Sequence, residues 1–300
     1  MRCRIMRSWQ SVAFEKFLLV RGTKRKFQNS KLMDEYIASK YNEVPYQLDE
    51  TFRLKNDILK NEINGMRFYT INEQRKPKKV IYYFHGGAYI NDPLSFHWRY
   101  LIKLAKATEF TIVVPIYPKL PRHTVLECYE AIHALYEQLV EQYEAPFIFM
   151  GDSAGGGLAL GFAQDVKLLN KKQPEHIIMH SPWLDVTGVD PRYKQLEKHD
   201  PMLGIQGAQE LGRLWAKNVG IHDYKVSPLN GDIQDIGKLT LFVGTGELLL
   251  VDAQMLREKA KQQLVPLNYF EYNKMNHVFP VFPVPEAKKA FKELLNIIQT

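Results

Sequence analysis

Short apolar runs of strand length recur along this chain from about residue 80 onward, and most of them lack alternation with polar residues. Strands buried on both faces have this composition, which is typical of a parallel sheet with helices packed on either side. Stretches of helical spacing separate most of the runs. The sequence therefore predicts an α/β fold around a mostly parallel sheet. The predicted strands are Val80–Phe84, Thr111–Ile116, Phe147–Met150, His176–His180, Leu239–Gly244 and Leu267–Tyr272.

The intervening helices give the order β-α-β-α-β-α-β, then an insertion, then β-α-β-α. The insertion, about residues 186–238, has irregular flanks around a helical segment near Gln206–Asn218. Apolar positions at helical spacing in residues 1–45 predict two amphipathic helices. We expect these helices and the insertion to form a cap on a catalytic domain spanning residues 46–300. Further strands are predicted around Phe52–Leu59 and Met66–Ile71, and helices over Tyr100–Ala107, Thr124–Tyr143, Ala154–Leu169, Asp252–Leu264 and Pro285–Ile298.

The overall composition is that of an ordinary soluble protein, since 45% of the 300 residues are hydrophobic and 24% are charged. No apolar stretch is long enough to span a membrane, so we expect no stable membrane insertion. The two cysteines, Cys3 and Cys128, have no paired or metal-type spacing, which favours a cytoplasmic protein without a disulfide framework.

The formal net charge is +7, and basic residues are concentrated near the start of the chain. The simplest interpretation is a solvated basic face with no nucleic-acid partner. An anionic lipid surface or nucleic acid is the alternative interpretation of that charge. The basic residues are Arg2, Arg4, Arg7, Arg21, Lys24, Arg25 and Lys26.

The segment Gly151–Gly155 matches the pattern G-x-S-x-G, with Ser153 at its centre. An apolar strand precedes it and a helix-like run follows, which is the context of a nucleophile on a sharp strand-to-helix turn. Small residues are needed on both sides because the backbone there is strained and closely packed. Such a turn places Ser153 at a helix N-terminus, where the Ala154 N–H can stabilise a developing negative charge. A phosphate loop is the alternative, but no lysine follows the glycines.

The loop His85–Tyr89, with the sequence H-G-G-A-Y, follows the first of the predicted parallel strands. Its glycines leave backbone N–H groups unshielded, so that a substrate oxygen can approach them closely. We therefore predict Gly86 and Gly87 as oxyanion donors.

Together, the H-G-G-A-Y loop, G-D-S-A-G-G at Gly151–Gly156 and S-P-W-L-D at Ser181–Asp185 resemble the hormone-sensitive-lipase-like branch of the α/β-hydrolases in order and spacing. The resemblance covers the chain from about Lys79 to Thr300. It implies an eight-stranded sheet, a helical cap over the active site and hydrolysis of carboxylic esters. No metal or organic cofactor is expected, because side chains and backbone amides complete this chemistry.

An α/β-hydrolase has its acid and its histidine after the serine in chain order, in loops that follow late strands. Glu247 and His277 satisfy this order. Many family members have an aspartate followed by proline at the position of Glu247, so Asp252 remains a rival acid, although it could instead cap a helix. His176 and His180 lie about 13 Å apart along one strand face, too far to share a metal ion.

These residues predict a serine carboxylesterase for short to medium acyl esters, with a small-molecule ester as its partner. His277 would take the Ser153 proton and Glu247 would orient the imidazole. Long lipids are disfavoured because a cap limits access and the sequence shows no clear interfacial anchor. An acyltransferase or deacylase of a decorated metabolite, and a non-catalytic ligand-binding homologue, are the alternatives. Aromatic residues that could form an apolar pocket, or simply core, are Tyr89, Trp98, Trp183 and Phe279.

Overall fold

The computed structural model describes residues 2–3 and 7–299, whose strands form a nine-stranded sheet in the order β1-β9-β8-β7-β6-β4-β5-β3-β2. Neighbouring strands are parallel except where β3 pairs with β2 and β5. Strand β1 contains only Arg2–Cys3, and the other eight strands correspond to the sheet that the family resemblance implies. The mostly parallel α/β fold is therefore confirmed. These strands are β2 (Ile58–Ile63), β3 (Met66–Ile71), β4 (Val80–Phe84), β5 (Thr111–Pro115), β6 (Phe147–Asp152), β7 (His176–His180), β8 (Lys238–Gly244) and β9 (Leu267–Tyr272).

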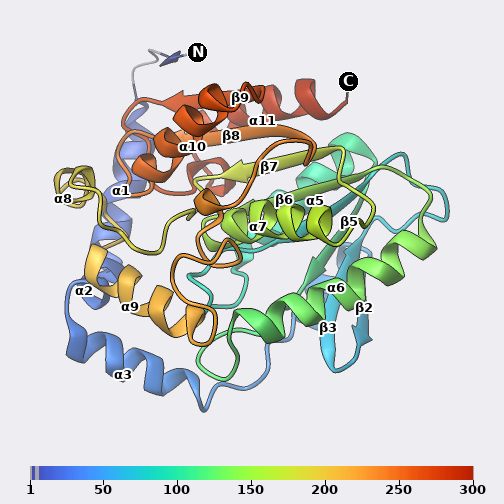
Figure 1. Ribbon diagram of the computed structural model, residues 1–300, viewed down its shortest axis with the longest axis horizontal. Helices are drawn as coiled ribbons and strands as arrows, with labels where there is room; N and C mark the ends of the chain where they lie inside the picture. The colour runs from blue at the N-terminus through green and yellow to red at the C-terminus, as the bar shows by residue number, and fades with distance from the viewer. Residues whose placement is uncertain (1, 4–6, 300) are drawn as a thin grey trace.

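Helices cover both faces of the sheet (Figure 1). In β4, Tyr82 and Phe84 pack into one core, whereas Ile81 and Tyr83 pack into the core on the opposite face. Successive side chains of a strand point to opposite faces, and apolar residues at every position therefore bury both. The helices on the Tyr82 face are α6 (Val125–Gln142), α7 (Ala154–Leu168) and α10 (Leu250–Gln262), and those on the Tyr83 face are α5 (Ser95–Thr108) and α11 (Pro285–Ile298).

The N-terminal segment forms three helices where the sequence predicted two. Gly22 ends α1 with a φ of +68°, a left-handed conformation that glycine adopts without strain, and α2 begins directly after it. Gly207 of the insertion lies against Phe27 and Met33, so the N-terminal helices pack on the insertion (Figure 1). Arg4 lies outside the described residues. These helices are α1 (Trp9–Arg21), α2 (Thr23–Phe27), α3 (Ser30–Lys40), α8 (Arg192–Leu196) and α9 (Ile205–Ala216), with short 3₁₀ turns at Pro228–Asn230 and Phe279–Val281.

The strand predicted around Phe52–Leu59 was wrong over its first half. Helix α4 (Glu50–Lys55) occupies that half, and β2 begins only at Ile58. The Asp49 side chain accepts a hydrogen bond of 2.7 Å from the Phe52 N–H and so caps the helix, which overrides the apparent alternation. In the described part of the chain, we find no helix with the length and apolar character needed to cross a bilayer.

Candidate active site

Ser153 lies on the turn between β6 and α7, with φ 53° and ψ −124°. Its N–H donates to the His180 carbonyl at 2.9 Å, and its carbonyl accepts from the Trp183 N–H at 2.9 Å. A Cβ atom on Gly155 would overlap the Phe84 carbonyl oxygen, which shows why this turn needs glycine. The local sequence therefore holds Ser153 in a strained conformation at the carboxyl end of a central strand.

His277 and Glu247 lie beside Ser153 in a hydrogen-bonded line. The His277 Nε2 atom is 2.9 Å from Ser153 Oγ, and its Nδ1 atom is 2.6 Å from Glu247 Oε2. Glu247 follows β8 and His277 follows β9, so both come from loops at the same edge of the sheet as Ser153. The histidine and the glutamate are buried, while Ser153 is half-buried and thus accessible to a small molecule.

The second carboxylate oxygen of Glu247 is also held. Its Oε1 atom accepts from the Gly244 N–H at 2.6 Å and from the Ser181 hydroxyl at 2.8 Å. Ser181 Oγ in turn accepts from the Val278 N–H at 3.0 Å, next to His277. Ser181 therefore ties the glutamate loop to the histidine loop. Sequence reasoning placed Ser181 only in a family motif, because no local pattern indicates a contact between residues so distant in the chain.

The environment of His277 stabilises the charged form of its imidazole. Burial opposes the charged imidazolium, but the hydrogen bond to Glu247 and the negative charges of Glu247, Asp200 and Asp152 outweigh it and raise the pKa of His277. A carboxylate that stabilises an imidazolium is the electrostatic requirement for proton transfer from a serine.

Asp252, the rival acid, lies elsewhere. Its Oδ2 atom accepts from the backbone N–H groups of Leu184 and Asp185 at 2.6 and 2.9 Å, and its Oδ1 atom accepts from the Tyr193 hydroxyl at 2.7 Å. Burial raises the pKa of this carboxyl to about 7, despite the three donors. These contacts hold the S-P-W-L-D stretch in place. The carboxylate that contacts His277 is therefore that of Glu247 and not that of Asp252.

The loop His85–Tyr89, here called the oxyanion loop, differs in detail from the sequence expectation. The Gly86 N–H donates to Asp152 Oδ1 at 3.0 Å, so this donor is already engaged. Gly87 has a φ of +132°, and within the described residues no acceptor takes the N–H of Gly87 or Ala88. Ala154 is the first residue of α7, where backbone N–H groups lack intrahelical acceptors. The available donors are therefore Gly87, Ala88 and Ala154 in place of Gly86.

Asp152 fixes this loop. Its buried carboxylate also accepts from the Tyr83 hydroxyl at 2.6 Å and lies 3.2 Å from His97 Nε2. Burial opposes ionisation, but the charge and hydrogen bond of His97, together with the other donors, lower the pKa of Asp152 to about 2. Asp152, next to Ser153 in the chain, thus positions the loop His85–Tyr89.

The four candidate pocket residues divide between the two cores. Tyr89 stacks on Trp183 at 5.5 Å and on Trp215 at 4.4 Å, close to the first turn of α7. Trp98 and Phe279 are instead buried in the core on the opposite face, where Trp98 donates to the Tyr46 hydroxyl at 2.7 Å. The structure therefore brings Tyr89 and Trp183 together and does not place Trp98 or Phe279 with them.

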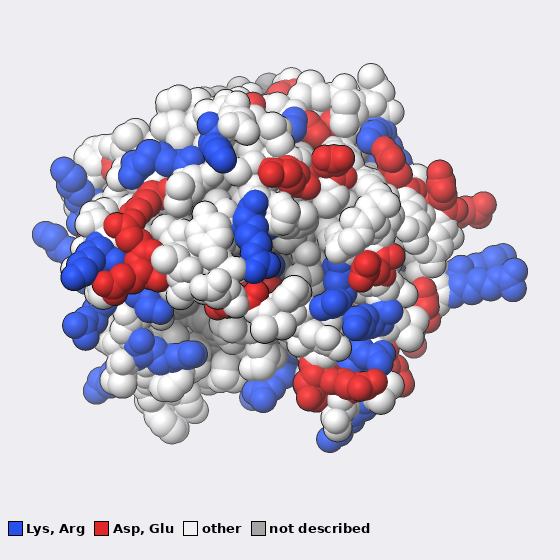
Figure 2. Space-filling view, turned by 90° about the horizontal axis from the view of Figure 1, so that it is seen from below, with Lys and Arg blue, Asp and Glu red and all other residues white. Residues whose placement is uncertain are grey.

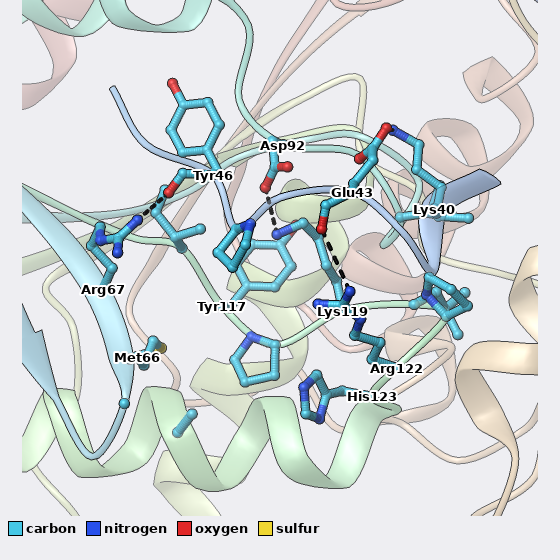
Figure 3. Close-up of a pocket in the computed structure, with 18 of the residues that line it drawn as sticks. Lys40, Glu43, Tyr46, Met66, Arg67, Asp92, Tyr117, Lys119, Arg122 and His123 are labelled. Atoms are coloured by element: carbon cyan, nitrogen blue, oxygen red, sulfur yellow. Dashed lines mark hydrogen bonds and ion pairs between the residues drawn. The ribbon is translucent and has the colours of Figure 1, made fainter. Parts of the chain in front are cut away.

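A cavity of about 360 Å³ with both charged and apolar lining residues lies beside the oxyanion loop (Figure 3). Ile90 and Asp92 line it on the side of that loop, and a 2.6 Å ion pair joins Asp92 to Lys119. None of Ser153, Glu247 and His277 lines this cavity. It is therefore separate from the proposed reaction centre.

No group of three or more His, Cys, Asp or Glu side chains in the described part of the chain is arranged to hold a metal ion. His176 Nε2 lies 2.8 Å from the Thr240 hydroxyl, and His180 Nε2 lies 2.8 Å from the Tyr100 hydroxyl. Both histidines therefore have partners on neighbouring elements.

A nucleophile turn after a central parallel strand, with a histidine and a carboxylate from later loops, is the arrangement of an α/β-hydrolase. The family described as alpha/beta hydrolase fold matches residues 81–281, and the chain belongs to this family.

Known relatives agree with this placement. An esterase of Acinetobacter venetianus is 32% identical over 235 residues, which cover 77% of this chain and 78% of the relative. A solved Staphylococcus aureus protein, provisionally named an esterase, superposes on this chain with a TM-score of 0.86 and 29% sequence identity. The match covers 93% of this chain and 96% of the Staphylococcus protein. An esterase from the bacterial hormone-sensitive lipase family has a TM-score of 0.82 and 22% identity, and the match covers 98% of this chain and 99% of that esterase. At this identity the comparison shows a shared fold.

Proposed function

We propose that Ser153, His277 and Glu247 form the catalytic triad of this carboxylic ester hydrolase. The observation that carries the proposal is the hydrogen-bonded line from Ser153 Oγ through His277 to Glu247, with separations of 2.9 and 2.6 Å. Both lengths are within the range for a nucleophile, its base and the residue that orients the base.

In the proposed reaction, Ser153 Oγ attacks the ester carbonyl carbon while His277 Nε2 takes its proton. The carbonyl oxygen becomes an oxyanion that the N–H groups of Gly87, Ala88 and Ala154 can hold. His277 then gives the proton to the departing alcohol, leaving an acyl group on Ser153. A water molecule, deprotonated by His277, releases the acid and regenerates the serine.

We also propose that residues 1–45 and 186–238 form a cap over this centre, as the packing of Phe27 and Met33 on Gly207 suggests. Bulky aromatic residues, Tyr89, Trp183 and Trp215, are stacked and buried beside the helix that carries Ser153. We infer that their volume confines the space available to an acyl chain. We therefore favour short to medium acyl esters, and p-nitrophenyl esters of increasing chain length measure this preference. An optimum on long acyl chains would contradict it.

The triad is tested by Ser153→Ala. Without the nucleophile no acyl-enzyme forms, and kcat should fall by about 10⁶-fold on p-nitrophenyl esters. The matched control is Ser95→Ala, because Ser95 is an exposed serine at the start of α5. Turnover by Ser153→Ala at a rate near that of Ser95→Ala would exclude Ser153 as the nucleophile.

A further inference from the structure

Helix α1 exposes an apolar face that no described part of the chain covers. The side chains of Trp9 and Val20 are 75% and 87% exposed, and Val12, Phe17 and Leu19 are also exposed. At about 3.6 residues per turn, Trp9 and Val20 are three turns apart and lie on the same face of the helix. Scattered apolar residues are common on protein surfaces, but here five large ones lie on about half of the circumference of one helix, with the exposed Lys16 among them.

The opposite face of α1 is anchored, which fixes the exposed face outward. The Ser8 N–H donates to Glu286 Oε1 at 2.6 Å, and Ser11 also donates to the Glu286 carboxylate. The ring of Phe14 packs against Phe282 at 4.8 Å. Because these contacts occupy the inner face of α1, the apolar outer face cannot turn inward without breaking them.

The net charge of the protein is concentrated in the same segment. Residues 1–29 contain eight lysines and arginines and one acidic residue, Glu15, so they account for the entire net charge of +7. The remaining residues carry equal numbers of basic and acidic side chains. Figure 2 shows several Lys and Arg side chains along its left edge, with Asp and Glu side chains beside them, on the side where α1 to α3 lie in Figure 1.

Several of these cations are available to a partner. Lys16, Arg21, Arg25 and Lys26 are exposed, and within the described residues none of them forms an ion pair with a carboxylate. Arg21 lies over the Phe17 ring at 5.8 Å, at the margin of the apolar face. Cationic and apolar side chains are thus interleaved on one surface.

We propose that α1 and α2 form a peripheral anchor that binds the surface of a bilayer containing anionic phospholipid. An amphipathic helix with Trp, Phe and Leu on one side and basic residues around it can bury its apolar face at the boundary between headgroups and acyl chains. Anionic headgroups neutralise the excess charge of the segment. A second copy of this chain fits less well, because it would bring two strongly basic segments together.

This inference goes beyond the proposed reaction and does not depend on it. Helix α2 packs against α9, so an anchored α1 would hold the proposed cap near the lipid surface. Esters that partition into a bilayer would then be concentrated beside the enzyme, whatever its preferred acyl length.

The test uses Trp9, which is the exposed one of the four tryptophans, since Trp98, Trp183 and Trp215 are at most 5% exposed. The full chain is mixed with vesicles of phosphatidylcholine alone or with added phosphatidylserine. We expect co-sedimentation and a blue shift of tryptophan emission with the phosphatidylserine vesicles, both weakened by salt. Val20→Ser with Phe17→Ser should abolish binding, and each of Lys16→Ser and Arg25→Ser should weaken it by about fivefold.

The matched control is Leu168→Ser, because Leu168 is a large apolar residue that is 64% exposed and lies at the far end of α7, outside the proposed cap. This variant should bind vesicles as the unaltered protein does. The proposal is overturned if phosphatidylserine vesicles do not sediment the protein, or if the α1 variants bind as well as the control. It is also overturned if Val20→Ser instead dissolves a dimer in sedimentation velocity. Hydrolysis of a soluble ester, measured on the same samples, separates these outcomes from failure of the proposed triad.

Discussion

Glu247 and Asp252 are both fully buried carboxyls after β8, yet different donors surround them. Glu247 lies 2.6 Å from His277 Nδ1, whereas Asp252 accepts hydrogen bonds from two backbone amides and a tyrosine. A carboxylate can orient the histidine only through direct contact with the imidazole N–H. The two acids are therefore expected to respond differently to neutralisation.

We predict that Glu247→Gln lowers kcat by about 10³- to 10⁴-fold, because an amide favours the wrong imidazole tautomer and cannot stabilise its cation. Asp252→Asn should change kcat by less than about tenfold and act mainly on stability, through its hydrogen bonds to the Leu184 and Asp185 amides. Steady-state kinetics with one p-nitrophenyl ester checks both variants. A larger loss of kcat in Asp252→Asn would reverse the assignment of the acid.

The pH dependence of the reaction reports on His277. Catalysis needs neutral imidazole, and the pKa of His277 is raised above its ordinary value of 6.5. Activity should therefore be lost as pH falls through a value above 6.5. Profiles of kcat/KM measure this limb for the free enzyme. Glu247→Gln removes an interaction that raises the pKa of His277, so the acid limb of this variant's profile should lie at lower pH. An unchanged acid limb would show that Glu247 does not raise this pKa.

Among the structural elements, the junction of β6 and α7 has no room for a side chain at Gly155. The Gly155 backbone lies against the Phe84 carbonyl, which belongs to the end of β4 and leads into the oxyanion loop. This contact packs the turn that carries Ser153 directly against the strand that leads into the loop with the proposed oxyanion donors. The motif glycines are thus a packing requirement as well as a conformational one.

We predict that Gly155→Ala destabilises the fold by at least about 3 kcal/mol, because the added methyl group meets backbone that cannot move away cheaply. Gly65→Ala is the comparison. Gly65 has a φ of +79° but open space around it, so its cost should be only the left-handed backbone strain of about 1 to 2 kcal/mol. Urea unfolding of both variants measures the difference. Equal destabilisation would mean that packing at Gly155 does not matter.

At the scale of the whole molecule, the ionised Asp152 links the nucleophile turn to β4, the oxyanion loop and α5. The pKa of its carboxyl is about 2 in the folded state, against about 3.9 in an unfolded chain. A lowered pKa contributes stability above the unfolded value, and that contribution is lost as pH falls toward the folded value.

The free energy of unfolding should therefore decline by about 2 kcal/mol through Asp152 between pH 4 and pH 2. In Asp152→Asn this contribution disappears, so the decline should be shallower over the same range. Denaturant unfolding followed at several pH values measures both slopes. Identical slopes would show that Asp152 does not govern this part of the acid transition.

Much of the fold follows from local patterns. Buried parallel strands need apolar residues on both faces, so β4 to β8 were recognisable from their composition, and the prediction for α11 agrees with its observed bounds. The glycine-flanked Ser153 and the loop from His85 were equally recognisable, because sharp turns and close backbone approach require particular residues. Where a capping side chain competed with apparent alternation, as at α4, the local pattern misled.

The sequence by itself determined the sheet class, the nucleophile turn and the chain order of the candidate triad, because these depend on short-range periodicity and turn chemistry. Only the tertiary structure decided which carboxyl meets His277, which loop N–H groups remain available and which face of α1 stays exposed. Those outcomes depend on contacts between residues far apart in the chain. No short segment contains both partners, and burial or exposure exists only once the elements have packed.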